Sequence, residues 1–76
     1  MKHFEVQYFV GSTCFVYKTM SPSDAFQAVC NALATDNGLT EARQDDAFCA
    51  IAKMKESGRG AWDAFHVRIA IFNGEV

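Results

Sequence analysis

Two histidines and a glutamate are the residues of this chain best suited to proton transfer or metal binding. His3 and Glu5 lie two positions apart near the N-terminus, and His66 lies near the C-terminus. Imidazole and carboxylate groups bind transition metals, and imidazole exchanges protons near neutral pH. No two of these residues have the spacing that metal ligands show within one element. The pattern therefore favours two surface histidines over a metal site.

The chain also contains three widely spaced cysteines, Cys14, Cys30 and Cys49. An odd count without a C-x-x-C pair is not typical of a disulfide framework and indicates reduced thiols in a cytoplasmic protein. A nucleophilic cysteine needs a nearby base, and Cys14 has Lys18 or His66 as candidates. We interpret Cys14 as an inert apolar residue and Cys30 as a core residue, and the exposure of Cys49 stays open.

Motifs and overall charge exclude several classes of function. The 76 residues contain no phosphate-binding loop, dinucleotide fingerprint, serine-hydrolase elbow or zinc-protease motif. The formal net charge of −2 argues against a phosphate-binding surface for nucleic acid. No apolar run approaches the roughly 20 residues of a membrane helix, and the N-terminus has no secretory signal pattern. We expect a non-catalytic protein without a cofactor or metal.

The stretch EVQYFVGSTCFVYK, residues 5–18, predicts a β-hairpin. Gly11 and Ser12 form its turn, and a glycine at the first central position is typical of a type II′ turn. In the resulting register Glu5 lies opposite Lys18, and such an opposite-charge pair mildly stabilises a sheet. A shift of one residue would separate this pair and exchange the two faces.

This register divides the hairpin into two faces of different character. The inner face, expected to meet a core, consists of Phe4, Val6, Tyr8, Val10, Phe15 and Tyr17. The outer face is mixed and consists of His3, Glu5, Gln7, Phe9, Cys14, Val16, Lys18 and Met20.

Two amphipathic helices are expected next. Ser21 is the N-cap of the first, Asp24 is placed to reach back to the Ser21 amide, and Asn37-Gly38 offers a left-handed stop. Thr40 is expected to cap the second helix, which Gly58 ends. The apolar stripe of the first helix is Ala25, Phe26, Val29, Cys30 and Leu33. The stripe of the second is Ala47, Phe48, Ile51, Ala52 and Met54.

The segment 64–72 predicts one more strand. Phe65, Val67, Ile69 and Ile71 alternate with His66, Arg68, Ala70 and Phe72. The expected fold is a single α+β domain over residues 1–76, a two-layer ββααβ arrangement with a three-stranded sheet and two helices on one face. The third strand would run antiparallel beside the second strand or parallel beside the first, and both placements stay open.

A partly apolar outer sheet face indicates binding to another protein, through that face or a sheet edge. The expected contact residues are Phe9, Val16, Lys18, Trp62, Arg68 and Phe72. Trp62 has two interpretations, a half-buried lid on the core or an interface anchor beside Arg59 and Arg68.

Our leading hypothesis is an adaptor or inhibitor, and small phage or mobile-element proteins that target a host have this general size. One alternative is a structural homodimer that pairs through its sheet face or edge. Another is a nucleic-acid-binding sheet, against which the acidic chain and the inward-facing aromatic residues argue. A third is a thiol or metal protein that uses Cys14 with the histidines.

Overall fold

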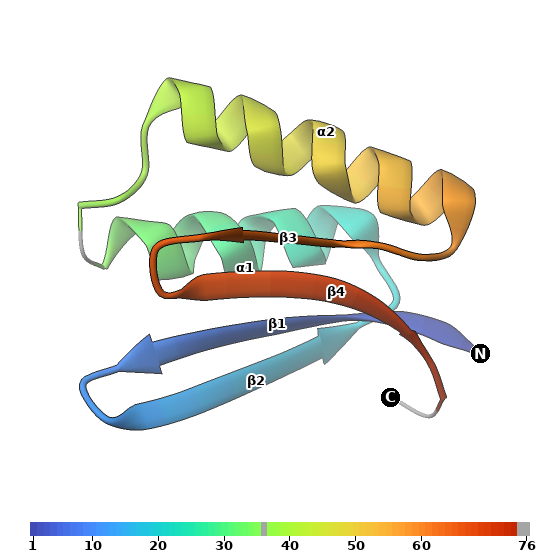
Figure 1. Cartoon of the computed structure of the whole chain (residues 1–76), viewed down its shortest axis with the longest axis horizontal. Coiled ribbons are helices and arrows are strands. Elements are labelled where there is room, and N and C mark those ends of the chain that lie inside the picture. The colour runs from blue at the N-terminus through green and yellow to red at the C-terminus, as the bar shows by residue number, and fades with distance from the viewer. Residues whose placement is uncertain (36, 75–76) are drawn as a thin grey trace.

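The protein, shown by a computed structural model that describes residues 1–35 and 37–74, has two layers (Figure 1). In chain order the elements are β1 (Lys2–Val10), β2 (Thr13–Thr19), α1 (Pro22–Ala34), α2 (Glu41–Ser57), β3 (Ala61–Ala64) and β4 (Val67–Asn73). The strands form one sheet in the order β2-β1-β4-β3, and every neighbouring pair is antiparallel. The predicted α+β class is confirmed, but the sheet has four strands rather than three.

The C-terminal part of the sheet differs from the prediction because the strand expected over 64–72 is mainly β4, and an unpredicted strand, β3, precedes it. Ala64 pairs with Val67, so Phe65 and His66 form a two-residue turn between β3 and β4. The added strand reverses the chain direction, and β4 therefore lies antiparallel beside β1. Both predicted placements of this strand are wrong for that reason. Phe65, expected on the inner face of a strand, is instead a turn residue that is 67% exposed.

The N-terminal hairpin has the predicted register. Glu5 lies opposite Lys18, and Tyr8 lies opposite Phe15 with the two rings stacked 5.4 Å apart. Gly11 has a φ of 62°, as the first central position of the predicted turn requires. The assignment of residues to the two faces of the hairpin follows from this register and is confirmed.

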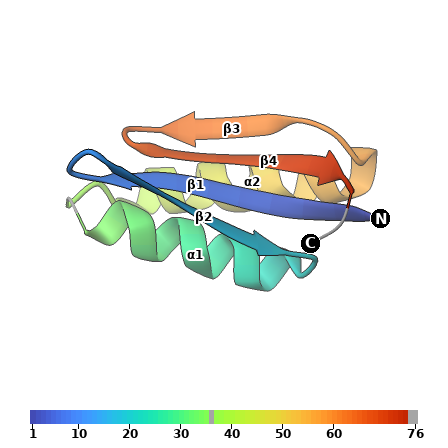
Figure 2. The same ribbon diagram turned by 90° about the horizontal axis from the view of Figure 1, so that it is seen from below.

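Both helices lie on the same side of the sheet, and Figure 2 views the sheet from the opposite side. The helix-covered side is the inner face, and the other side is the outer face. Six large side chains between the layers are fully buried: Phe4, Val6, Val29, Leu33, Val67 and Ile69. Burying a side chain of this size contributes about 1.5–3 kcal/mol to stability, so this cluster is the main stabilising feature of the fold.

The inner face of β2 is less covered than its sequence predicts. Val10, Phe15 and Tyr17 lie on the inner face, but they are 53%, 44% and 44% exposed. The cause is the placement of the helices over four strands. α2 packs on β3 and β4, and α1 alone covers the remaining width. β2 lies at the edge of the sheet, where α1 contacts it and α2 does not (Figure 2).

The start of α1 has the predicted cap with one change. The Ser21 hydroxyl accepts a hydrogen bond from the Asp24 amide at 3.3 Å, as expected of an N-cap. The expected return bond from Asp24 to the Ser21 amide is replaced, because that amide donates to the Thr19 hydroxyl at 3.1 Å. Thr19 in turn donates to the Asp24 carboxylate at 3.5 Å. The end of β2 and the start of α1 are thereby connected through one buried threonine.

The remaining helix ends follow their sequence signals. Asn37 has a φ of 55° after the end of α1. Thr40 caps α2 by accepting from the Arg43 amide at 3.1 Å, and Gly58 ends α2 with a φ of 73°. The predicted stripe of the first helix is buried, except that Phe26 is only partly so.

The predicted stripe of the second helix is correct only in part. Ala47, Ile51 and Met54 are buried, whereas Ala52 is exposed and Phe48 is 60% exposed. Phe48 meets the edge of the Phe26 ring with centroids 5.5 Å apart, so it packs on α1 rather than on the sheet. Neither helix in the described part of the chain has the length and apolar character needed to cross a membrane.

Candidate partner-binding surface

The outer face of the sheet carries charged and polar side chains across its middle. Val16, Gln7, Arg68 and Asp63 form one row across β2, β1, β4 and β3. Lys18, Glu5, Ala70 and Ala61 form the adjacent row. Each row places one residue from every strand side by side on the same face, so these charges form one continuous surface.

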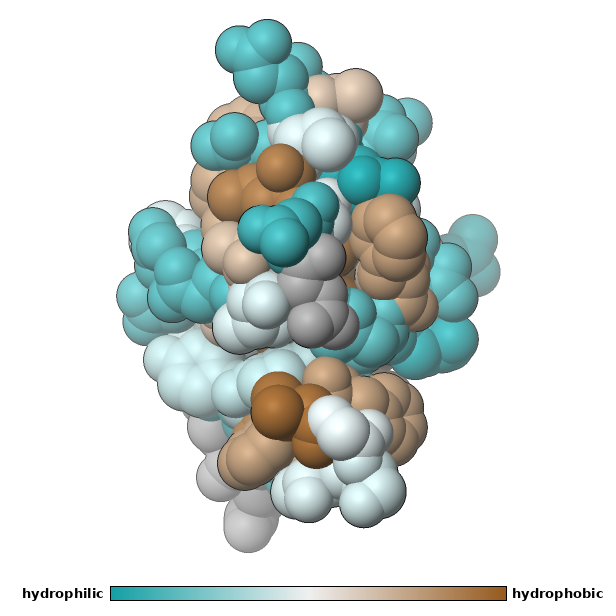
Figure 3. All heavy atoms as spheres, turned by 90° about the vertical axis from the view of Figure 1, so that its left-hand side faces the viewer, coloured by the Kyte–Doolittle hydropathy of each residue, from teal (hydrophilic) through white to brown (hydrophobic). Residues whose placement is uncertain are grey.

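Apolar side chains lie at both ends of this charged middle. Phe9, 50% exposed, lies near the β1–β2 turn, and Val16, the β2 end of the row with Gln7, is 51% exposed. Phe72, 43% exposed, lies at the other end of the face, opposite His3. Met20, directly after β2, is 48% exposed. Figure 3 looks onto the end of the molecule with the turns, where hydrophobic surface gathers over the tip of the β1–β2 hairpin.

Five of the residues expected at the contact surface share the outer face, and one does not. Phe9, Val16, Lys18, Arg68 and Phe72 are all exposed there. Trp62 lies opposite Ile69 on the inner face, where it is partly buried against the core. Of its two interpretations, the lid on the core is the one the structure supports. The expected patch of Trp62 with Arg68 does not form, because the sheet separates the two side chains.

His3 points to the outer face as predicted, but it is buried rather than a surface residue. Only 3% of it is exposed, since it lies beside Phe72 with ring centroids 6.2 Å apart. Its Nε2–H donates to the Glu5 carboxylate at 2.9 Å. Its Nδ1 is buried without a hydrogen-bond partner among the described residues.

The two histidines lie at opposite ends of the sheet. His3 lies on β1, which pairs with β4, and His66 directly precedes β4. The antiparallel direction of the two strands, however, places His66 beside Phe9, whose amide donates to the His66 carbonyl at 3.3 Å. The His66 Nε2–H donates to the Ala32 carbonyl at 3.1 Å. Within the described residues no cluster of three or more potential metal ligands forms.

The three cysteines occupy different environments, and all are free thiols. Cys30 is buried in α1 as predicted, and burial raises the pKa of its thiol. Cys14 and Cys49 are exposed, which answers the open question about Cys49. The Cys14 thiol is 3.9 Å from the Phe15 carbonyl oxygen.

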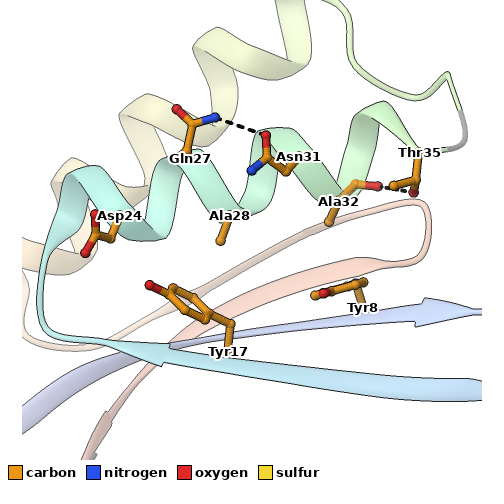
Figure 4. A pocket seen from close by; sticks show the side chains of 8 residues that line it. All are labelled: Tyr8, Tyr17, Asp24, Gln27, Ala28, Asn31, Ala32 and Thr35. Atoms are coloured by element: carbon orange, nitrogen blue, oxygen red, sulfur yellow. Dashed lines mark hydrogen bonds between the residues drawn. The ribbon is translucent and has the colours of Figure 1, made fainter.

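The structure also contains a groove that sequence reasoning missed. It has a volume of about 410 Å³ and lies between α1 and the inner face of β1 and β2. Figure 4 shows Tyr8 and Tyr17 on the sheet side, below Ala28 and Ala32 of α1. Asp24, Gln27, Asn31 and Thr35 complete its lining. The signal was present in the small alanine side chains of α1, which leave space above the tyrosine rings.

A second unpredicted feature is the contact between Arg43 and Phe65. The Arg43 guanidinium lies 4.0 Å from the centre of the Phe65 ring and also donates to the Gly38 carbonyl at 2.9 Å. Phe65 has a φ of 54°, a conformation that is rare for a bulky residue. The arginine therefore connects the β3–β4 turn to the segment before α2. Nothing in the local sequence indicates this contact, since the two residues lie in separate elements.

Comparisons of the chain with protein-family models, with curated proteins and with solved structures gave no match.

Proposed function

We propose that this protein is a non-catalytic binding module, of the adaptor or inhibitor type, that contacts another protein through the outer face of its sheet. The observation that carries the proposal is the pair of apolar ends on a face that neither helix covers. Phe9, Val16 and Phe72 are each between 43% and 51% exposed there. An antiparallel sheet with one face on its core normally turns polar residues to water on the other face.

The polar middle of the same face supports specific rather than general association. Lys18 and Arg68 are exposed beside Glu5 and Asp63, so both signs of charge are present. Interfaces commonly combine apolar anchors with charged groups that select and orient the partner. Burial of the apolar ends would supply about 25 cal/mol per Å² of apolar area, and the charges would set the register.

The experiment is affinity capture from a lysate of the source organism with three immobilised baits. The first is the unchanged protein, and the second carries Phe9→Ser with Arg68→Glu on the outer face. The third carries Phe48→Ser with Lys53→Glu, which repeats the same chemical changes on the exposed surface of α2. Circular dichroism confirms the fold of each bait before use.

We expect quantitative mass spectrometry to identify a protein that binds the first and third baits but not the second. Removing interface anchors of this kind weakens the affinity for the partner by about 30-fold or more. If the third bait loses the captured protein while the second retains it, the helices are the binding surface and the proposal is wrong.

A further inference from the structure

β2 differs from the other strands because it is exposed on both faces and along one edge. On its inner face Phe15 and Tyr17 are each 44% exposed, and on its outer face Val16 is 51% exposed. The strand has seven residues, of which only Thr19 is buried. A long apolar edge strand of this kind pairs readily with another strand.

The backbone of β2 presents hydrogen-bonding groups at this edge. The Phe9 amide donates to His66, so Phe9 directs its backbone groups to β4 and not to β2. Phe9 and Cys14, which lie opposite each other on β1 and β2, are therefore a pair without backbone hydrogen bonds between them. Such pairs alternate with hydrogen-bonded pairs along two antiparallel strands. By this alternation Cys14, Val16 and Lys18 direct their amide and carbonyl groups to the open edge.

We infer that the β2 edge binds β2 of a second copy of this chain, in an antiparallel pair centred on Val16. The two copies would be related by a two-fold axis, so each surface is its own complement. In this register Val16 faces Val16 and Phe15 faces Tyr17 of the second copy. Cys14 faces Lys18, and Thr13 faces Thr19. All seven residues of the strand are then paired.

Charge and packing favour this occupant and this register. Lys18 is the only charged residue of β2, and a pairing centred on it would oppose two lysines. The register centred on Val16 instead brings Phe15 beside Tyr17, the tyrosine that lines the groove below α1. The other sheet edge is less suited, because β3 has only four residues and carries Asp63.

The pairing goes beyond the proposed function and does not compete with it. It uses the edge of β2 and leaves the outer face open. The result would be a continuous sheet of eight strands, twice the four in one copy. Its outer face would present Phe9, Val16 and Phe72 from both copies to one partner.

The first test is the mass in solution across a concentration series, by analytical ultracentrifugation. Val16→Pro removes the central amide that faces the edge, while the bonds between β2 and β1 are left intact. Val16→Thr is the matched control, because it keeps the amide and a β-branched side chain. The unchanged protein and Val16→Thr should rise from 8.4 kDa towards twice that mass with concentration. Val16→Pro should need a concentration at least about tenfold higher.

A monomeric mass for the unchanged protein at all concentrations up to about 1 mM would overturn the inference. An unchanged dimerisation constant in folded Val16→Pro would overturn it as well. Neither result bears on partner capture, so the two proposals fail separately.

The second test is a cross-link that reports the register. Val16→Cys, with Cys14 and Cys49 replaced by serine, places two thiols opposite each other at the two-fold axis. The Cα separation of about 5.5 Å in a hydrogen-bonded antiparallel pair suits a disulfide. Added oxidant should cross-link this variant rapidly, whereas Gln7→Cys in the same background should stay monomeric, since β1 lies one strand further inside. Equal rates for the two variants would contradict the register.

Discussion

Glu5 and the buried His3 form a hydrogen-bonded pair on the outer face of the sheet. The His3 Nε2–H donates to Glu5 at 2.9 Å, and the other ring nitrogen has no hydrogen-bond partner among the described residues. Removing the carboxylate would leave both nitrogens of a 3%-exposed ring unsatisfied. An unsatisfied buried polar group costs about 1–3 kcal/mol.

Glu5→Ala should therefore lower the free energy of unfolding by about 1–3 kcal/mol, as measured by urea denaturation. Gln7→Ala is the control, since Gln7 lies in the adjacent row of the same strand and face. Its effect should stay within about 0.5 kcal/mol. Equal losses for the two variants would show that the bond to His3 contributes nothing particular.

The thiols give a second prediction for individual residues. Burial raises the pKa of Cys30, and the thiolate is the reactive form, so at pH 8 Cys30 is both less accessible and less ionised. Cys14 and Cys49 should react first with a thiol reagent in the folded protein, and Cys30 should react at the same rate only after unfolding. Rapid labelling of Cys30 in the folded state would contradict its place in α1.

The two hairpins use different residues at the same turn position. Gly11 has a φ of 62° in the β1–β2 turn, and Phe65 has a φ of 54° in the β3–β4 turn. A glycine adopts this conformation without strain, whereas other residues incur a cost. The contact of Phe65 with Arg43 offsets part of that cost.

Gly11→Ala should lower the free energy of unfolding by about 1 kcal/mol, because of backbone strain alone. A Cβ at this position would meet no atom within 4 Å, so steric contact makes no contribution. Gly74→Ala is the control, since it also adds a Cβ in open space and lacks a positive φ. Thermal unfolding of the two variants measures the difference, and a neutral Gly11→Ala would contradict the turn assignment.

The same two turns explain which elements could be predicted from the sequence. Gly11 indicates the turn between β1 and β2, and the Glu5–Lys18 pair indicates the register of the two strands. The structure has both. Phe65 and His66 carry no turn signal, and the alternation of apolar residues continues through them, so the sequence predicts one strand over 64–72 and no strand before it. The caps Ser21 and Thr40 act locally, and local signals were sufficient for the helix starts.

For the candidate surface, the sequence could predict only which residues of a correctly predicted strand share a face. Alternation along a strand placed Phe9, Val16 and Arg68 on the outer face. It could not show that Trp62 lies on the inner face, because Trp62 belongs to the unpredicted strand. It also could not show the exposure of Phe15 and Tyr17, which depends on how far α1 reaches across the sheet.

At the scale of the whole molecule, stability depends on the layer between the helices and the inner face. Phe4 is 1% exposed within it, whereas Phe48 is 60% exposed at the outside of the helix pair. Both are phenylalanines, so their truncation separates the effect of burial from that of residue type.

Phe4→Ala should cost about 3–5 kcal/mol of unfolding free energy, a large share of the stability of so small a domain. Phe48→Ala should cost about 1 kcal/mol, the contribution of an edge-to-face pair with Phe26. Chemical denaturation of both variants provides the comparison. A greater loss for Phe48→Ala would place the main core between the helices instead of on the sheet.

If the outer sheet face binds the partner and the helices support this face from behind, charge reversal should affect binding on the sheet and not on the helices. The dissociation constant of the captured partner for two charge variants, measured by calorimetry, separates the two surfaces. Arg68→Glu changes the outer face, and Lys53→Glu makes the same change of charge on α2. Arg68→Glu should weaken binding by about 30-fold or more, and the dissociation constant of Lys53→Glu should stay within about threefold of that of the unchanged protein. Strong loss at Lys53 with normal binding at Arg68, both proteins being folded, would contradict binding through the outer sheet face.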